Sequence, residues 1–160
     1  MCGISGYISQ KKGINRDILK QMSLSLFHRG PDNFGNWVSN DNSIGLSHSR
    51  LSIIDLSDTG NQPMTSHCGR YVIVLNGEIY NHQDIRKKIE RNSDSTKWYG
   101  HSDTEILLES FSLFGFKNTL KKIRGMFAIA LWDKLKKCLY LARDRIGEKP
   151  LYYGKYKDVF

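Results

Sequence analysis

Short apolar runs separated by glycine and polar residues predict strands in the first half of the chain and again near its end. The run 2–8 is interrupted by Gly3 and Gly6 and predicts a buried strand that begins next to the N-terminus. Comparable runs predict further strands at 35–39, 44–54 and 70–76. Two later runs, 126–132 and 138–142, flank a lysine-rich turn, as is typical of an antiparallel hairpin.

Helical spacing of apolar residues is confined to the segments between these runs. Residues 16–27 show it first, and the breakers Gly30 and Pro31 follow in a tight loop, His28-Arg29-Gly30-Pro31-Asp32. A charged helix is predicted over 82–91, followed by a polar loop over 92–101. Ser102, with Glu105 three residues later, matches a capping box and predicts a helix that runs to Gly115.

The order of the predicted elements favours an α+β fold over a parallel α/β fold. Strands come first, helices lie in the middle and strands return, whereas a parallel sheet requires strict alternation of strands and helices. A content of 39% apolar and 25% charged residues fits neither a disordered chain nor a membrane protein. The N-terminus lacks the pattern of a signal peptide, so we expect a cytoplasmic protein without a membrane partner.

The net charge of +8 is unevenly distributed along the chain. Residues 1–116 hold twelve basic and twelve acidic side chains, whereas 117–160 hold twelve basic and four acidic ones. This basic segment is either a solvated face or a docking surface for a neighbouring domain. It carries no recognisable nucleic-acid-binding motif, so we expect no nucleic-acid partner.

The cysteines and histidines do not predict a metal site or a disulfide framework. Cys2, Cys68 and Cys138 are far apart and odd in number, and the five histidines lack ligand spacing. Cys2 has a separate interest because it follows the initiator Met1. Removal of Met1 would leave the thiol beside a free α-amine, and an ordinary α-amine, with a pKa of about 7.7–8.0, can accept a thiol proton at neutral pH.

Several motifs occur together with Met1-Cys2 in a fixed order along the chain. They are MCGISGY, HRGPD, HSRLSIIDLSDTGNQPM, VLNGEIYNH, SDTE and GMFAIALWD followed by LARDRIGEKPLYYG. In this set the chain resembles the N-terminal glutaminase domain of glutamine-dependent asparagine synthetases, a class II glutamine amidotransferase of the N-terminal-nucleophile hydrolase type. The resemblance implies a four-layer αββα sandwich, with 1–160 as one domain and a C-terminal synthetase domain beyond residue 160.

The resemblance also assigns roles to individual residues. Cys2 would attack the side-chain amide of glutamine, while the Asn76 amide and the Gly77 backbone N–H would stabilise the oxyanion. The remaining residues would hold the amino-acid end of glutamine: Arg50 its carboxylate, Glu78 and Asp103 its ammonium, with backbone groups near Ile54 completing the pocket.

Several of these assignments have a plainer alternative. Asn76-Gly77 between apolar runs is also a strong hairpin signal, and Asp103 also suits the first turn of a helix. Arg50 alone would pass as a surface ion-pair residue. His28 and Asp32 could form a triad with Cys2, although an N-terminal amine makes a separate base unnecessary, and HRGPD then forms a pocket wall.

The expected function is hydrolysis of glutamine to glutamate and ammonia, with the ammonia used by the synthetase domain to make asparagine from aspartate. ATP and Mg²⁺ would belong to that domain, because 1–160 has no pyrophosphate-binding loop and needs no cofactor of its own. Another carboxylate acceptor, such as a surface-polysaccharide uronic acid, remains an alternative, and so does a non-catalytic glutamine-binding or regulatory domain. A homodimer is left open.

Overall fold

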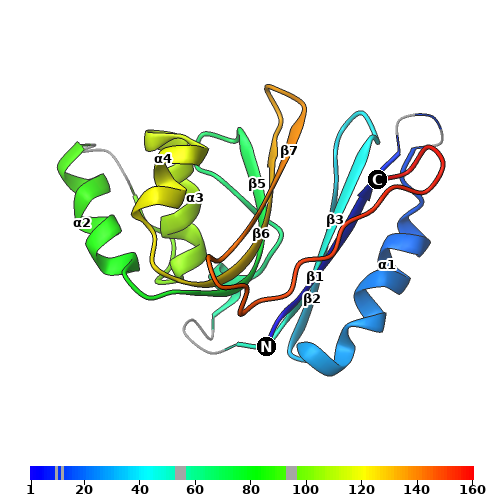
Figure 1. Cartoon of the computed structure of the whole chain (residues 1–160), viewed down its shortest axis with the longest axis horizontal. Helices are drawn as coiled ribbons and strands as arrows, with labels where there is room; N and C mark the ends of the chain where they lie inside the picture. The colour runs from blue at the N-terminus through cyan, green and yellow to red at the C-terminus, as the bar shows by residue number, and fades with distance from the viewer. Residues whose placement is uncertain (10, 12, 53–56, 93–96) are drawn as a thin grey trace.

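Two antiparallel sheets stack face to face, and helices cover both outer faces, as the computed structural model in Figure 1 shows. The structure describes residues 1–9, 11, 13–52, 57–92 and 97–160. The smaller sheet has the strand order β1-β3-β2, with bounds Gly3–Ile8, Ile44–Arg50 and Asn33–Val38. The larger sheet has the order β4-β5-β6-β7, with bounds Met64–Thr65, Tyr71–Ile79, Gly125–Asp133 and Cys138–Arg143.

Among the described residues, one α-helix lies on the outside of the smaller sheet and three lie on the side of the larger one (Figure 1). The first is α1, Arg16–Ser25, and the others are α2, α3 and α4, at His82–Asn92, Asp103–Phe114 and Phe116–Lys122. The layers therefore follow the order helix, sheet, sheet, helix. This confirms the α+β class and the four-layer αββα sandwich.

The alternation of side chains along β3 and β5 divides the apolar residues between two cores. Ile44 and Leu46 of β3 meet Val72 and Val74 of β5 between the sheets. The intervening residues of β5, such as Ile73, pack instead against the helices of the outer layer. Because successive side chains point to opposite faces, His48 and Arg50 continue the inner face of β3, and Asn76 and Glu78 continue that of β5. Four polar residues are thus placed at neighbouring ends of the inter-sheet layer.

Several element boundaries differ from the sequence prediction. The strand predicted over 44–54 ends at Arg50, and its last two residues, 53 and 54, lie outside the described residues. The strand predicted over 70–76 extends to Ile79, because Asn76–Ile79 pair with the start of β6. The sequence did not predict the two-residue β4 or the seven-residue α4, since both are too short to show a period. Among the described residues, no helix is long and apolar enough to cross a membrane.

Candidate active site

Cys2 directly precedes β1, and neighbouring segments hold its backbone and side chain. The pairing of Gly3 with Ser49 places Cys2 beside the end of β3. The Leu51 N–H lies 3.4 Å from Cys2 Sγ, and Arg29 Nε donates a hydrogen bond of 3.1 Å to the Cys2 carbonyl. The thiol is therefore fixed at the end of the sheet instead of on a fraying terminus.

A pocket of about 110 Å³ opens beside this thiol and collects most of the residues that the sequence singled out. The predicted residues that line it are Cys2, Arg50, Asn76, Gly77, Glu78 and Asp103. They come from the residue that precedes β1, from β3 and β5, and from the first turn of α3, so the pocket depends on the tertiary packing of all four segments. Ile54, the remaining predicted residue, lies outside the described residues.

Asn76 and Gly77 lie within strand β5, so the alternative of a hairpin turn at Asn76-Gly77 is wrong. They pair with Ala128 and Phe127 of β6. A Cβ atom added to Gly77 would lie 2.1 Å from the Met126 carbonyl oxygen, so the close approach of β6 requires glycine at this position. The Asn76 side chain is only 4% exposed, and in the described part of the chain its amide makes no hydrogen bond.

Two carboxylates face the other side of the pocket. Asp103 is buried at the first position of α3, and its Oδ2 accepts a 2.8 Å hydrogen bond from the Ile79 N–H. Burial raises the pKa of Asp103 above its ordinary value, and the hydrogen bond from Ile79 only partly offsets this effect. Glu78 is half-buried and forms no ion pair with any described residue. The two acidic groups make this wall suited to a cation.

Arg50 supplies positive charge where β3 meets the pocket. Its Nη1 donates to the Ser57 carbonyl at 2.8 Å and to Asn61 Oδ1 at 2.6 Å, which fixes the plane of the guanidinium. The side chain is buried and lines the pocket, so Arg50 is not an ordinary surface ion-pair residue. A guanidinium held in this way presents donors to a carboxylate in a fixed geometry.

His48 is a pocket residue that the sequence analysis did not assign. It is 1% exposed, and its Nε2 lies 3.2 Å from the Leu75 carbonyl across the gap between the sheets. Burial, together with the nearby charge of Arg50, lowers the pKa of His48 to about 4. The imidazole is therefore neutral at pH 7, and its Nε2 carries the proton that is donated to Leu75.

Gln62 and Thr104 also went unassigned, and together they brace the pocket. Gln62 Oε1 accepts a 2.6 Å hydrogen bond from the Leu75 N–H, while its Nε2 donates to Thr104 Oγ1 at 3.2 Å. Lys149 is a further lining residue that sequence reasoning missed. His48, Gln62, Thr104 and Lys149 each lie inside one of the quoted motifs, and that position is the signal that could have singled them out.

The HRGPD loop supports the nucleophile through Arg29. Neither His28 nor Asp32 is among the residues that line the pocket, and His28 is exposed. Asp32 accepts a 2.8 Å hydrogen bond from the Ser52 N–H, and Gly30 packs so closely on β3 that an added Cβ would lie 2.3 Å from the Ser49 carbonyl. This geometry favours a supporting wall over a triad of Cys2, His28 and Asp32.

Comparison with known proteins places this arrangement in a family. The family model of the glutamine amidotransferase domain matches residues 1–160. The chain is 37% identical to asparagine synthetase [glutamine-hydrolyzing] 1 of Bacillus subtilis, over 99% of this chain and 25% of that protein. It is 36% identical to a putative asparagine synthetase [glutamine-hydrolyzing] 2 of Methanocaldococcus jannaschii, over 96% of this chain and 32% of that protein.

Two further matches extend the comparison. The amidase chry2 of Gibberella zeae is 38% identical over 99% of this chain and 25% of its own length. The solved structure of glutamine phosphoribosylpyrophosphate amidotransferase from B. subtilis matches the fold with a TM-score of 0.75 at 17% identity, covering 99% of this chain and 40% of that one. The chain thus spans a quarter to a third of the length of these curated relatives. It belongs to the glutamine amidotransferase family, as a class II domain homologous to those of glutamine-hydrolysing asparagine synthetases.

Proposed function

We propose that this domain hydrolyses glutamine to glutamate and ammonia with Cys2 as its nucleophile, once Met1 has been removed. One observation carries the proposal. The thiol of Cys2 shares a small pocket with the side-chain amide of Asn76, which is open to the pocket and makes no hydrogen bond to any described residue. An amide that is held beside a thiol with its donors free can bind a reacting atom without first breaking another hydrogen bond.

The reaction needs no base other than the terminus itself. The α-amine of Cys2 would take the thiol proton, and the thiolate would then attack the side-chain amide carbon of glutamine. The protonated amine would return that proton to the departing nitrogen, so that the C–N bond breaks as ammonia leaves and the γ-glutamyl thioester remains. Water then attacks the thioester, the C–S bond breaks and glutamate is released.

Asn76 and Gly77 would act on the tetrahedral intermediates of both steps. The Asn76 amide lines the pocket beside the thiol, and Gly77 brings the backbone of β5 close to the same place. Donors held rigidly before the reaction stabilise a developing oxyanion because they need no reorganisation. Strand β5 supplies this rigidity through its pairing with β6 over its whole length.

The charged groups of the pocket would select an amino acid over a simple amide. Arg50 would bind the α-carboxylate of glutamine, and Asp103 with Glu78 would bind its α-ammonium. Hydrogen bonds to main-chain groups hold both side chains in place: the Ile79 N–H donates to Asp103, and Arg50 donates to the Ser57 carbonyl. The side-chain amide of glutamine would then point toward Cys2.

In the whole protein, the ammonia would serve a synthetase domain that uses ATP and Mg²⁺ to make asparagine from aspartate. The curated relatives support this proposal, because two of them are named asparagine synthetases and all three extend well beyond the matched region. Because one of these relatives is named an amidase, amidation of another carboxylate, such as a uronic acid, is the second candidate. The cytoplasmic location and a homodimer stay predictions.

The experiment that tests the glutaminase proposal joins intact-mass measurement to an assay of glutamate release. We expect release from protein that has lost Met1, and none from the variant Cys2→Ala or from protein that retains Met1. Cys138→Ala, which removes a half-buried cysteine away from the pocket, is the matched control and should keep full activity. Turnover by protein with Met1 attached would overturn the mechanism, while glutamine binding without turnover would favour the non-catalytic alternative.

A further inference from the structure

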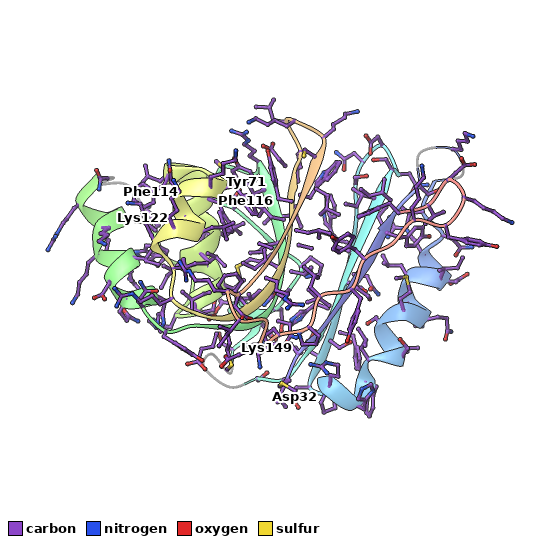
Figure 2. All side chains as sticks on the ribbon, in the orientation of Figure 1. Asp32, Tyr71, Phe114, Phe116, Lys122 and Lys149 are labelled. Carbon is purple, nitrogen blue, oxygen red and sulfur yellow. The ribbon has the colours of Figure 1, made fainter. Side chains whose placement is uncertain are left out.

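Lys149 is a buried lysine whose ammonium pairs with no acidic side chain of the described residues. It is 6% exposed and lines the pocket beside Cys2. Its ammonium lies 3.1 Å from the Met1 thioether sulfur and forms no ion pair with any described residue. Figure 2 shows Lys149 at the end of the sandwich where the N-terminus lies. Lysine is almost never fully buried unless it is paired, so this arrangement calls for an explanation.

The loop that carries Lys149 is held by Asp144, but not through the lysine ammonium. The Asp144 carboxylate accepts backbone N–H groups from Lys149, Glu148 and Phe127, at 3.0, 2.9 and 3.2 Å. Burial opposes ionisation of Asp144, yet these hydrogen bonds lower its pKa to about 2. Asp144 thus fixes the backbone of Lys149, while the Lys149 side chain extends toward the pocket.

The Met1 sulfur is a weak and temporary partner for this ammonium. A thioether is a poor hydrogen-bond acceptor, and the proposed activation removes Met1 altogether. A methionine sulfur lies within roughly 6 Å of the following peptide nitrogen, given bonds of about 1.5 Å, so the ammonium lies within roughly 9 Å of the Cys2 nitrogen. After Met1 is removed, that nitrogen is the α-amine of Cys2.

We propose that Lys149 is a positioning residue for the nucleophile, whose positive charge keeps the Cys2 α-amine unprotonated and favours the Cys2 thiolate. This inference rests on the proposed function. A cation nearby disfavours a second cation and favours an anion, so at neutral pH it keeps more of the amine in the form that can act as a base. Loss of the Met1 side chain would at the same time leave Lys149 facing the reacting groups.

Other charged groups also lie near the Cys2 thiol and nitrogen, and the Lys149 variants leave them unchanged. Arg29 from the HRGPD loop and Arg50 from β3 act in the same direction as Lys149. Glu78 and Asp103 act in the opposite direction, and His48 is neutral at pH 7. Arg50 is fixed by hydrogen bonds to Ser57 and Asn61, whereas the Lys149 ammonium bonds, within the described part of the chain, to the Met1 sulfur alone.

Two variants test the charge of Lys149 in protein that has lost Met1, as verified by intact mass. Lys149→Met removes the charge and keeps an apolar side chain of similar length, while Lys149→Arg keeps the charge. Lys155→Met, at an exposed lysine of the same segment that does not line the pocket, is the matched control. If Lys149→Met does not fold, Lys149→Gln provides the same uncharged comparison.

The first readout is the pH dependence of Cys2 alkylation by iodoacetamide, followed on the Cys2 peptide by mass spectrometry. The second is the acid limb of the pH profile of kcat/KM for glutamine. We expect Lys149→Met to move both midpoints upward by roughly one pH unit, as a charge at this separation does at an effective dielectric constant of about 20. Lys149→Arg and Lys155→Met should keep the original midpoints.

The outcomes separate this inference from the proposed function. Unchanged midpoints in Lys149→Met would overturn the role of Lys149, and a rise in KM at every pH with unchanged midpoints would assign Lys149 to substrate binding instead. A shifted alkylation midpoint without glutamate release from the unsubstituted protein would support the inference and overturn the glutaminase proposal. A loss of activity that is equal at every pH would show a purely structural role.

Discussion

At the scale of single residues, Asn76 combines deep burial with an amide that has no partner in the described structure. Its neighbours on the inner face of β5, Val72 and Val74, belong to the apolar layer between the sheets. The Asn76 amide reaches the pocket instead of being sealed in this layer, so it contributes little to stability and is free to bind a substrate atom. We therefore expect Asn76 to contribute to catalysis and little to stability.

Replacing Asn76 by alanine tests this expectation. We expect kcat for glutamine hydrolysis to fall about 10²–10³-fold with little change in KM, because the lost donor acts on the oxyanion more than on the substrate. The melting temperature should change little, since the lost amide makes no hydrogen bond to any described residue. Steady-state kinetics and thermal denaturation measure the two effects.

Asn36→Ala is the control for that substitution, because Asn36 is an exposed strand residue on β2. It should leave both kcat and melting temperature nearly unchanged. An unchanged kcat in Asn76→Ala would remove this side chain from the oxyanion site.

At the scale of secondary-structure elements, the beginning of α3 connects that helix to β5. Ser102 caps the helix as predicted, with its hydroxyl accepting the Glu105 N–H at 3.2 Å. Glu105 does not complete the capping box. Its carboxylate instead accepts the N–H groups of Tyr99 and Gly100 and contacts His67 Nε2. Asp103 is the acidic residue of the first turn of α3 that contacts β5 and lines the pocket.

The pKa of Asp103 leads to a prediction about stability and substrate binding. Because burial raises this pKa, the folded state disfavours the ionised carboxylate. The stability associated with protonated Asp103 is therefore lost as the pH rises through the folded-state pKa. Asp103→Asn removes the charge but still offers an oxygen to the Ile79 N–H. We expect KM for glutamine to rise about 10–100-fold, as when an ammonium loses a charged partner.

Asp103→Asn should weaken glutamine binding without weakening the fold. Its melting temperature at pH 7 should equal or exceed that of the unsubstituted protein, and its advantage should shrink as the pH falls through the raised folded-state pKa of Asp103. Thermal denaturation at pH 4 and 7 provides the measurement. A lower melting temperature at pH 7, or an unchanged KM, would contradict this assignment.

At the scale of the whole molecule, His48 joins the two sheets. Its Nε2 on β3 bonds to the Leu75 carbonyl on β5, within a layer otherwise formed mainly by apolar side chains. This bond requires a proton on Nε2, and the neutral imidazole supplies it. Protonation of the second nitrogen would place a buried charge between the sheets, close to Arg50.

Stability should therefore depend on pH through His48. The folded-state pKa of about 4 lies below the ordinary value of 6.5, so the unfolded chain binds more protons between these values, and stability falls as the pH drops through that window. We expect the unfolding free energy to lose about 2–3 kcal/mol from this residue between pH 7 and pH 4.5. Urea denaturation at both pH values measures the loss.

The comparison that isolates this effect uses His48→Gln, which keeps a donor for the Leu75 carbonyl but does not titrate. Its stability should vary less between pH 7 and pH 4.5 than that of the unsubstituted protein. His28→Gln, at an exposed histidine away from the pocket, should retain the full dependence. Equal pH dependence in His48→Gln and the unsubstituted protein would show that His48 titrates normally.

Local pattern was sufficient for most elements but not for their limits. The spacing of apolar residues predicted the helices at α1 and α3 and the hairpin of β6 and β7. Asn76-Gly77 shows why local pattern alone was ambiguous. The same dipeptide ends a strand in a hairpin turn or continues it, and here pairing with β6, about fifty residues later in the chain, selects the second.

The sequence by itself determined the identity of the nucleophile candidate at position 2 and the family to which its motifs belong. It also determined which residues share a face, because the two-residue period of a strand puts His48 with Arg50 and Asn76 with Glu78. Only the tertiary structure decided that these faces meet. Stacking the sheets brings the ends of β3 and β5 to Cys2, and the loop held by Asp144 brings Lys149 to Met1 from the far end of the chain. Such contacts depend on packing between distant segments, which no local period encodes.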